Sequence, residues 1–130
     1  MLHPAEPLFD DTNNNSVVLL LCYGNIHFLF TGDAEKEAEA SMKADGVLRN
    51  IEILKVGHHG SRSSSSQAFL DIIQPEVAIY MAGIDNRYGH PHAETLAALE
   101  DIGAVIYGTD SSGDIVVTTD GKIYAVATQK

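Results

Sequence analysis

The feature that most restricts the fold is the alternation of apolar runs with amphipathic helical segments along the 130-residue chain. Residues 16–23 and 26–30 are rich in aliphatic and aromatic side chains and are separated by Gly24-Asn25, which is typical of a β-hairpin. The remaining predicted strands cover 51–56, 76–82 and much of the tail from residue 104, and the predicted helices cover 34–44, 64–73 and 91–102. This order predicts one layered α/β domain.

Local signals support the first two predicted helices. Ala34, Ala38 and Met42 fall on one stripe of the first helix, as expected for a face that packs on a sheet. Ser64 and Gln67 have the spacing of a capping box at the start of the second helix. Both helices are therefore expected to cover the sheet.

Charge and composition limit the class of function. Eight basic and eighteen acidic residues give a net charge of −10, which repels phosphate backbones, so we do not expect autonomous nucleic-acid binding. No run reaches the roughly 18 apolar residues that a membrane span needs, so we expect a soluble domain. The single cysteine, Cys22, lies in an apolar run and is expected to be a buried structural thiol. The densest acidic residues, Glu35, Glu37 and Glu39, are expected mostly to form a solvated helix face.

Four polar clusters follow four of the predicted strands. The cluster TGD follows residues 26–30, GHHGS follows 51–56, GIDNRYGHPH follows 76–82 and GTDSSGD follows 104–107. In layered α/β folds, the loops at the carboxyl ends of the strands converge and build the ligand site. The placement of the clusters therefore predicts one shared site at that edge of the sheet.

Each candidate residue also has a structural interpretation. Asp33 precedes a helix, where a carboxylate caps the exposed amides without any chemistry. His58 and His59 lie between two glycines after a buried strand, a pattern that favours a ligand or acid–base role. For His90 and His92, which flank a proline at a helix start, turn and capping roles compete evenly with function.

Three further polar residues are interpreted from their places in the chain. Ser61 is a candidate donor to an anion, whereas the serines after it are expected to cap the next helix and to face solvent. His27 lies within a predicted strand and His3 in an expected N-terminal tail, so both are interpreted as structural or incidental.

Histidine and aspartate without a cysteine partner suit a zinc, manganese or iron site of mixed nitrogen and oxygen ligands. A serine nucleophile is disfavoured because GHHGS is not the G-x-S-x-G elbow. The glycine-rich segments also lack the Lys-Ser/Thr pair of a P-loop. The residue types therefore favour a metal site.

Four segments occur in a specific order: LHP, NNNSVVLLLCYGNIHFLFTGDAEKEAE, LKVGHHGSRSSSS and PEVAIYMAGIDNRYGHPHAETLAALEDIGAVIYGTDSSGDIVV. In this order they resemble the C-terminal half of the metallo-β-lactamase-like domain of ComEC-type DNA internalization competence proteins and their stand-alone hydrolase relatives. The resemblance spans nearly the whole chain. It implies an α/β fold, the C-terminal half of an αββα sandwich, with a mixed sheet and helices on one face. Residues 1–130 would then be a single, partial domain that lacks its N-terminal half.

The resemblance also implies roles for the candidate residues. Asp33 would bridge two metals, His59 would bind one of them, and His58 would contact phosphate or act as an acid or base. The reverse assignment of the two histidines stays open. Ser61 joins His58 in the implied catalytic group. The residues implied to line the substrate side are Asn86, Tyr88, His90 and His92.

One part of the family pattern is missing. The principal metal motif, H-x-H-x-D-H, belongs to the N-terminal half and does not occur in this sequence. Where many superfamily members have a further histidine ligand, this chain has NNNS at residues 13–16. We therefore expect a divalent metal, zinc or manganese, in the complete domain, and weak or no metal binding and no hydrolysis by the isolated chain.

Two functions follow as alternatives. In the first, the chain is part of a metal-dependent phosphodiesterase or nuclease linked to DNA uptake in competence, and it contacts DNA only through the complete parent protein. In the second, it is a non-catalytic assembly module whose exposed inner face binds the missing N-terminal half, another copy of itself or another partner. The parent is expected to be a bacterial membrane protein with this domain outside the cytoplasm; a secreted or a cytoplasmic location is the alternative.

Overall fold

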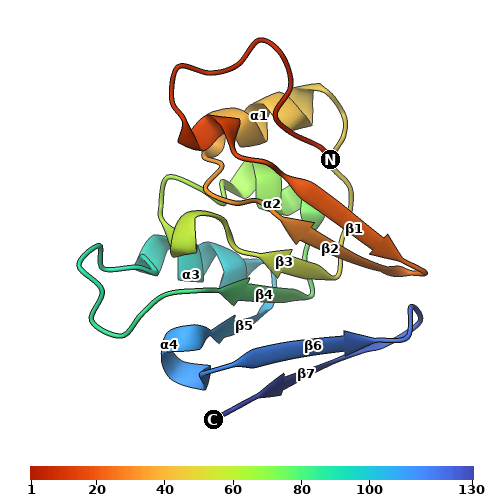
Figure 1. Cartoon of the computed structure of the whole chain (residues 1–130), viewed down its shortest axis with the longest axis vertical. Coiled ribbons are helices and arrows are strands. Elements are labelled where there is room, and N and C mark those ends of the chain that lie inside the picture. Colours follow the sequence, from red (N-terminus) through yellow and green to blue (C-terminus); the bar gives the residue numbers. More distant parts are fainter.

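A computed structural model describes residues 1–130 and contains a five-stranded sheet and a separate two-stranded sheet (Figure 1). The large sheet has the order β1-β2-β3-β4-β5, in which β1 and β2 are antiparallel and the other neighbours are parallel. The predicted hairpin and mixed sheet are therefore confirmed. The strands of the large sheet are β1 (Leu19–Tyr23), β2 (Ile26–Phe30), β3 (Ile53–Lys55), β4 (Val77–Tyr80) and β5 (Val105–Gly108).

Three helices pack on the same face of this sheet, as predicted (Figure 1). They are α1 (Lys36–Ala44), α2 (Gln67–Ile73) and α3 (Ala93–Asp101). A 3-10 turn, η1 (Asn13–Asn15), a tight turn, η2 (Gly57–Gly60), and a short helix, α4 (Thr109–Ser112), lie in the connections. None of the helices combines the length and the apolar character that crossing a membrane requires.

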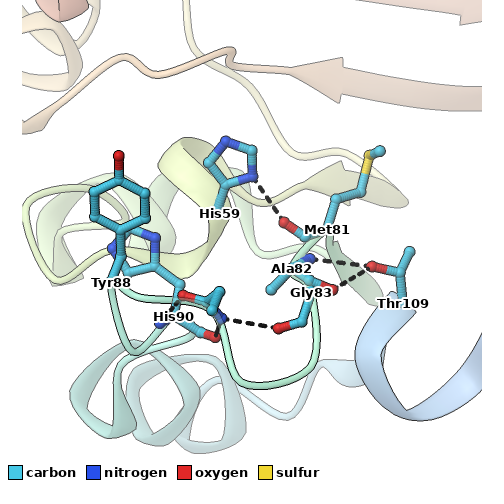
Figure 2. A pocket seen from close by; sticks show the side chains of 8 residues that line it. His59, Met81, Ala82, Gly83, Tyr88, His90 and Thr109 are labelled. Carbon is cyan, nitrogen blue, oxygen red and sulfur yellow. Dashed lines mark hydrogen bonds between the residues drawn. The ribbon is translucent and has the colours of Figure 1, made fainter.

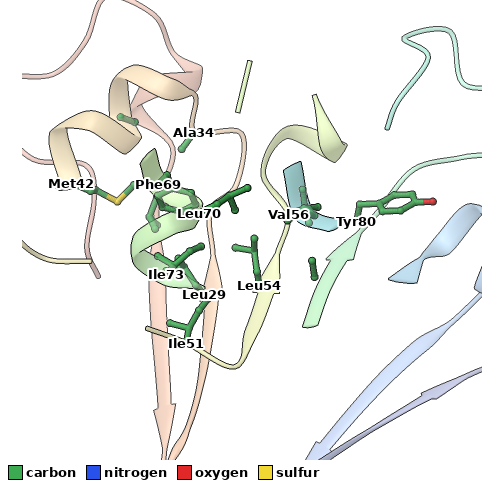
Figure 3. Close-up of a cluster of buried hydrophobic side chains, with 14 residues drawn as sticks. Leu29, Ala34, Met42, Ile51, Leu54, Val56, Phe69, Leu70, Ile73 and Tyr80 are labelled. Carbon is green, nitrogen blue, oxygen red and sulfur yellow. The ribbon is translucent and has the colours of Figure 1, made fainter. Parts of the chain in front are cut away.

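The hydrophobic core lies between the sheet and the three helices (Figure 3). Alternate strand residues such as Leu29 and Leu54 point toward the helices, because side chains alternate between the two faces of a strand. The predicted stripe of α1 is buried in this core. The helices contribute Ala34, Ala38 and Met42 from α1 and its start, Phe69, Leu70 and Ile73 from α2, and Leu99 from α3.

The opposite face of the large sheet, which we call the inner face, is only partly covered. A hairpin of β6 (Ile115–Thr119) and β7 (Tyr124–Thr128) crosses it, and the Asn25 N–H donates a 2.7 Å hydrogen bond to the Gly121 carbonyl at the hairpin turn. An apolar cleft of about 230 Å³ remains between hairpin and sheet. The inner-face side chains that stay exposed include Leu19, Leu21, Phe30 and Val105.

Two expectations about the first strands are wrong. Cys22 is exposed, because β1 is the edge strand of the sheet and only Leu20 of this strand packs against the core. His3 does not lie in a free tail, since it is buried, bridges Val18 as an additional strand residue and places its Nε2 2.6 Å from the Asn14 carbonyl oxygen. Its structural interpretation holds.

The predicted capping box at Ser64 is also wrong. The second helix begins at Gln67, and the Ser66 side chain caps it by accepting from the Phe69 N–H. Ser64 is buried and donates instead to the Ala34 carbonyl, at 2.7 Å. The serine tract therefore packs against the start of α1 rather than facing solvent.

Candidate functional site

Three of the four polar clusters meet at one edge of the large sheet. Because β2, β3 and β4 are neighbouring parallel strands, the loops that follow them leave at the same edge. These loops carry Asp33, the His58-His59 pair and residues 83–92. The fourth cluster contributes Thr109, which lies beside the loop after β4.

The histidine loop has an unusual backbone. His58 and His59 have φ angles of +48° and +55°, in the left-handed region that residues with a side chain rarely adopt. The following residue must be glycine, because a Cβ on Gly60 would lie 2.6 Å from the Pro91 Cβ. The histidine loop thus packs closely against the loop after β4, and its backbone is strained at both histidines.

His59 points one ring nitrogen at Asp33. Its Nδ1 lies 2.7 Å from the Met81 carbonyl oxygen, so Nδ1 carries the proton and donates to it. The Nε2 atom lies 4.0 Å from Asp33 Oδ1. In neutral His59, Nε2 therefore presents a lone pair toward the carboxylate, and a backbone carbonyl fixes the ring orientation, as is usual for metal-binding histidines.

His58 pairs with a carboxylate that the sequence analysis did not select. Its Nδ1 lies 3.1 Å from Glu35 Oε1 and 3.2 Å from Ser63 Oγ. The Ser63 hydroxyl donates to the same Glu35 oxygen at 3.0 Å, so it accepts from His58. Asp33 is thus paired with His59, and Glu35 with His58.

The acidic run on α1 is therefore not simply a solvated face. Besides Glu35, the carboxylate of Glu39 is buried and accepts from the N–H groups of Ser65 and Ser66, at 2.5 and 2.9 Å. Burial raises the pKa of Glu39, although these hydrogen bonds partly offset the effect. The spacing of Glu35 and Glu39 by four residues, on the same side as Ala38 and Met42, is a signal that the analysis did not use.

Asp33 does not cap α1, contrary to one of its two interpretations. The Asn14 side chain performs that role, since its Oδ1 accepts from the N–H groups of Glu35 and Ala38, both at 3.1 Å. The Ser16 hydroxyl accepts from the Asp33 N–H at 3.2 Å. The NNNS segment thus caps the helix and supports the Asp33 loop, which leaves the Asp33 carboxylate to face His59.

Two predicted site residues have their polar groups engaged within the protein. Ser61 is buried, and its hydroxyl lies 2.9 Å from the Ser63 hydroxyl. Asn86 donates to the carbonyls of Gly83 and His90 and accepts from the His90 N–H. Asn86 therefore fixes the loop after β4, and Ser61 helps to order the histidine loop.

His90 and His92 lie next to the histidine loop. The His92 ring makes no capping bond to α3 and instead accepts from the Arg62 N–H at 3.0 Å, so capping is not its role. The His90 ring lies 5.8 Å from the His58 ring and 4.8 Å from the His92 ring, measured between centroids. Burial, and then the positive charges of the neighbouring histidines, lower the pKa of His90, which favours a neutral ring.

A cleft of about 400 Å³ opens beside these rings (Figure 2). Tyr88 and His90 lie on one side of it and Met81 and Thr109 on the other, with His59 between them (Figure 2). The cleft therefore adjoins the His59–Asp33 pair. Its lining residues are His59, Met81, Ala82, Gly83, Asn86, Tyr88, His90 and Thr109.

Residues 1–84 match the family model described as the metallo-beta-lactamase superfamily. The chain belongs to this superfamily. Competence-protein relatives match most of its length, which confirms the resemblance. ComE operon protein 3 of Bacillus subtilis (strain 168) is 40% identical over 117 residues, 88% of this chain and 15% of the relative. Competence protein ComA of Neisseria gonorrhoeae is 37% identical over 86% of this chain and 16% of the relative. Recombination protein 2 of Haemophilus influenzae is 33% identical over 90% of this chain and 15% of the relative. The chain thus spans about one sixth of their length.

Metallo-β-lactamase superfamily members generally bind divalent metals, and Asp33 and His59 fit a part of such a site. Two ligand atoms that each lie about 2.1 Å from one ion are at most about 4.2 Å apart. The 4.0 Å between His59 Nε2 and Asp33 Oδ1 is within that limit. No group of three or more His, Cys, Asp or Glu side chains is arranged to hold a metal. The chain's own residues therefore offer at most Asp33 and His59 as candidate ligands, and not a full set.

A lysine near this pair was also missed by the sequence analysis. Lys55 ends β3, and its ammonium group donates to the Val56 carbonyl at 2.9 Å. Burial lowers the pKa of Lys55, whereas the negative charge of Asp33 raises it. Asp33 thus faces His59 and also interacts electrostatically with the partly buried Lys55 ammonium group.

Proposed function

We propose that this chain is part of a metal-dependent phosphodiester hydrolase, a nuclease that acts in DNA uptake during competence. The superfamily membership and the names of the competence-protein relatives support this assignment. The observation that carries it is the His59–Asp33 pair, in which Met81 holds the imidazole so that Nε2 faces the carboxylate at 4.0 Å.

In this proposal Asp33 and His59 hold a divalent ion, zinc or manganese. When bound, such an ion lowers the pKa of a water molecule and stabilises negative charge on the reacting phosphate. The His58 Nδ1–H donates to Glu35 and Ser63, so the Nε2 atom is free to accept or give a proton at the substrate. Tyr88, His90 and His92 line the substrate side.

We further propose that an N-terminal half of the domain, elsewhere in the parent protein, completes the ligand set. A hydrolytic metal site needs about three protein ligands per ion plus an open position for water. The isolated chain offers only the Asp33–His59 pair, so it is expected to bind metal weakly and to hydrolyse nothing. DNA would be contacted by the complete protein, because the net charge of −10 disfavours binding by this chain alone.

The test is hydrolysis of a phosphodiester substrate with added manganese or zinc. The chain is assayed alone and together with the preceding half of the domain, and turnover is expected only in the combination. Asp33→Ala should abolish this turnover, whereas Asp71→Ala, at an exposed carboxylate on α2, should not change it. Turnover by the isolated chain, or turnover that survives Asp33→Ala, contradicts the proposal.

The second candidate function is a non-catalytic assembly module. It is favoured by one observation, the exposure of four apolar inner-face side chains, Leu19, Leu21, Phe30 and Val105, at 41–54% of their surface. Leu19, Leu21 and Phe30 lie on the paired strands β1 and β2, whereas Val105 lies on β5 at the other edge of the sheet. Exposed apolar patches commonly mark interfaces. The occupant we propose is a second β-layer from the N-terminal half of the same domain. Sedimentation analysis of the chain with and without that half tests this, and self-association of the chain alone would instead favour a second copy.

We propose that the parent protein resides at the bacterial membrane with this domain outside the cytoplasm. A role in DNA uptake supports this location, because DNA that is taken up reaches the outer side first. Digestion of the domain by protease added to intact cells is the expected result. Full protection would favour the cytoplasmic alternative.

A further inference from the structure

Three aromatic rings form a stack that leads from the Asp33–His59 pair to the protein surface. The His59 and His90 rings are 6.3 Å apart and tilted by 13°, and the His90 and Tyr88 rings are 5.7 Å apart and tilted by 20° (Figure 2). Tyr88 ends the stack and is 61% exposed. The Arg87 guanidinium lies over the Tyr88 ring, 4.7 Å from the ring centroid, so a base that stacks on this face of Tyr88 displaces it.

The loop that carries Tyr88 is held in place before any ligand binds. Asn86 makes hydrogen bonds to the backbones of Gly83 and His90, which lie on either side of Tyr88 along the chain. The His90 ring, itself half-buried, supports the Tyr88 ring from behind. An exposed aromatic side chain on a fixed loop loses little conformational freedom when a ligand stacks on it.

The rest of the cleft presents few free hydrogen-bonding groups. The Thr109 hydroxyl accepts from the Ala82 N–H and donates to the Ala82 carbonyl, at 3.0 and 2.9 Å. The Met81 carbonyl accepts from His59, and the Met81 side chain lies across the cleft from Tyr88 (Figure 2). The cleft thus offers mainly ring faces and a thioether to a flat ligand.

The net charge of the chain also favours binding by stacking over binding by phosphate contacts. The net charge of −10 gives the chain no general attraction for a phosphate backbone. Stacking on aromatic side chains tolerates any base and does not depend on that attraction. A ligand with both a phosphodiester and a flat ring is held best if the ring enters the cleft while the phosphate lies at Asp33 and His59.

We propose that the cleft beside Tyr88 binds a nucleobase of single-stranded nucleic acid by stacking on the Tyr88–His90 rings, next to the phosphodiester to be cleaved. This inference rests on the proposed function for the identity of the phosphate site. A base within a duplex has both faces covered, so the substrate must be single-stranded at this nucleotide. Tyr88 is a specificity-determining residue in this account and takes no part in bond breaking.

The experiment is an NMR titration of the full chain in the presence of a chelator, so that it depends on neither metal nor hydrolysis. Thymidine 5′-monophosphate and 2-deoxyribose 5-phosphate are compared through the ring protons of His90 and Tyr88. We expect the nucleotide to bind about tenfold more tightly than the sugar phosphate, and Tyr88→Ala to remove this advantage, which corresponds to ~1.4 kcal/mol. Added salt should weaken the nucleotide complex little.

Two variants serve as controls. Tyr88→Phe keeps the ring and should keep the affinity within about twofold, since the stack needs no hydroxyl group. Tyr23→Ala removes a similarly exposed tyrosine, 56% accessible, at the end of β1 on the opposite edge of the sheet, and should have no effect.

Equal binding of nucleotide and sugar phosphate, or full affinity in Tyr88→Ala, overturns the inference. That failure is separate from a failure of the proposed function. Loss of hydrolysis in Asp33→Ala together with an unchanged KM in Tyr88→Ala, measured on the complete domain, refutes only the base site. Nucleotide stacking on a complete domain that never hydrolyses phosphodiesters refutes only the hydrolase.

Discussion

Replacing Gly60 with alanine tests how the histidine loop is locked to the loop after β4. Gly60 has a φ of +83°, and an added Cβ would lie 2.6 Å from the Pro91 Cβ and 3.1 Å from the Pro91 Cα. The left-handed backbone costs an alanine about 1–2 kcal/mol, and overpacking adds about 1–3 kcal/mol. The free energy of unfolding is therefore expected to fall by about 2–5 kcal/mol.

Gly46 provides the matched control. Its φ is +66°, but nothing lies within 4 Å of an added Cβ, so Gly46→Ala should cost only the backbone contribution of about 1–2 kcal/mol. Urea unfolding followed by circular dichroism measures both variants. The ring protons of His58 and His59 should shift in Gly60→Ala and not in Gly46→Ala. Equal losses of stability, with unchanged histidine spectra, would refute the claim that the Pro91 contact positions the imidazoles.

Three further outcomes are expected. Asn14→Ala should lower the free energy of unfolding by about 1–2 kcal/mol, because the cap of α1 is lost. Asn50→Ala, which loses two long hydrogen bonds of 3.3 and 3.4 Å, should lower it less in the same urea assay. Because the pKa of Glu39 is raised in the folded protein, its contribution to stability is fully present below the ordinary pKa of 4.5 and is lost as pH rises through the pKa of the folded state. The free energy of unfolding of the wild type, relative to that of Glu39→Gln, should therefore decline between these two pH values. A difference that grows with pH contradicts this. NMR titration should show that the pKa of His90 lies below the ordinary value of 6.5, and His92→Gln should raise the pKa of His90. An unshifted His90 pKa in the wild type contradicts the effects of burial and of the neighbouring histidines.

The sequence predicts the sheet and the meeting of Asp33 with His59 for the same reason. Apolar runs identify strands, and parallel neighbours end at one edge. The register pairs Phe30 with Lys55, so Asp33 and His59 follow at nearly equal distances from paired residues. What local patterns cannot predict is which groups the carboxylates of Glu35 and Glu39 bind. Glu35 and Glu39 share a side of the helix with Ala38 and Met42, but their partners Ser63, Ser65 and Ser66 come from the loop after β3.

The remaining misses arise from contacts between distant segments. Cys22 looks buried because its run is apolar, but a strand at the edge of a sheet has no neighbour on one side. Asp33 is the predicted cap of α1, but Asn14 caps this helix in the structure, because η1 folds back over the start of α1. Loops whose shape depends on such side-chain hydrogen bonds, including the Asn86 loop, need the tertiary structure before their roles can be read.

Asp33 and His59 are proposed to bind a divalent metal together, and paramagnetic NMR with manganese tests this binding. Even weak binding broadens the resonances nearest the ion, so the isolated chain is sufficient. Broadening is predicted to centre on Asp33, His59 and Met81, and to disappear in Asp33→Ala and in His59→Ala but not in Asp71→Ala. Broadening centred on another acidic cluster, or broadening that persists in both site variants, contradicts the claim.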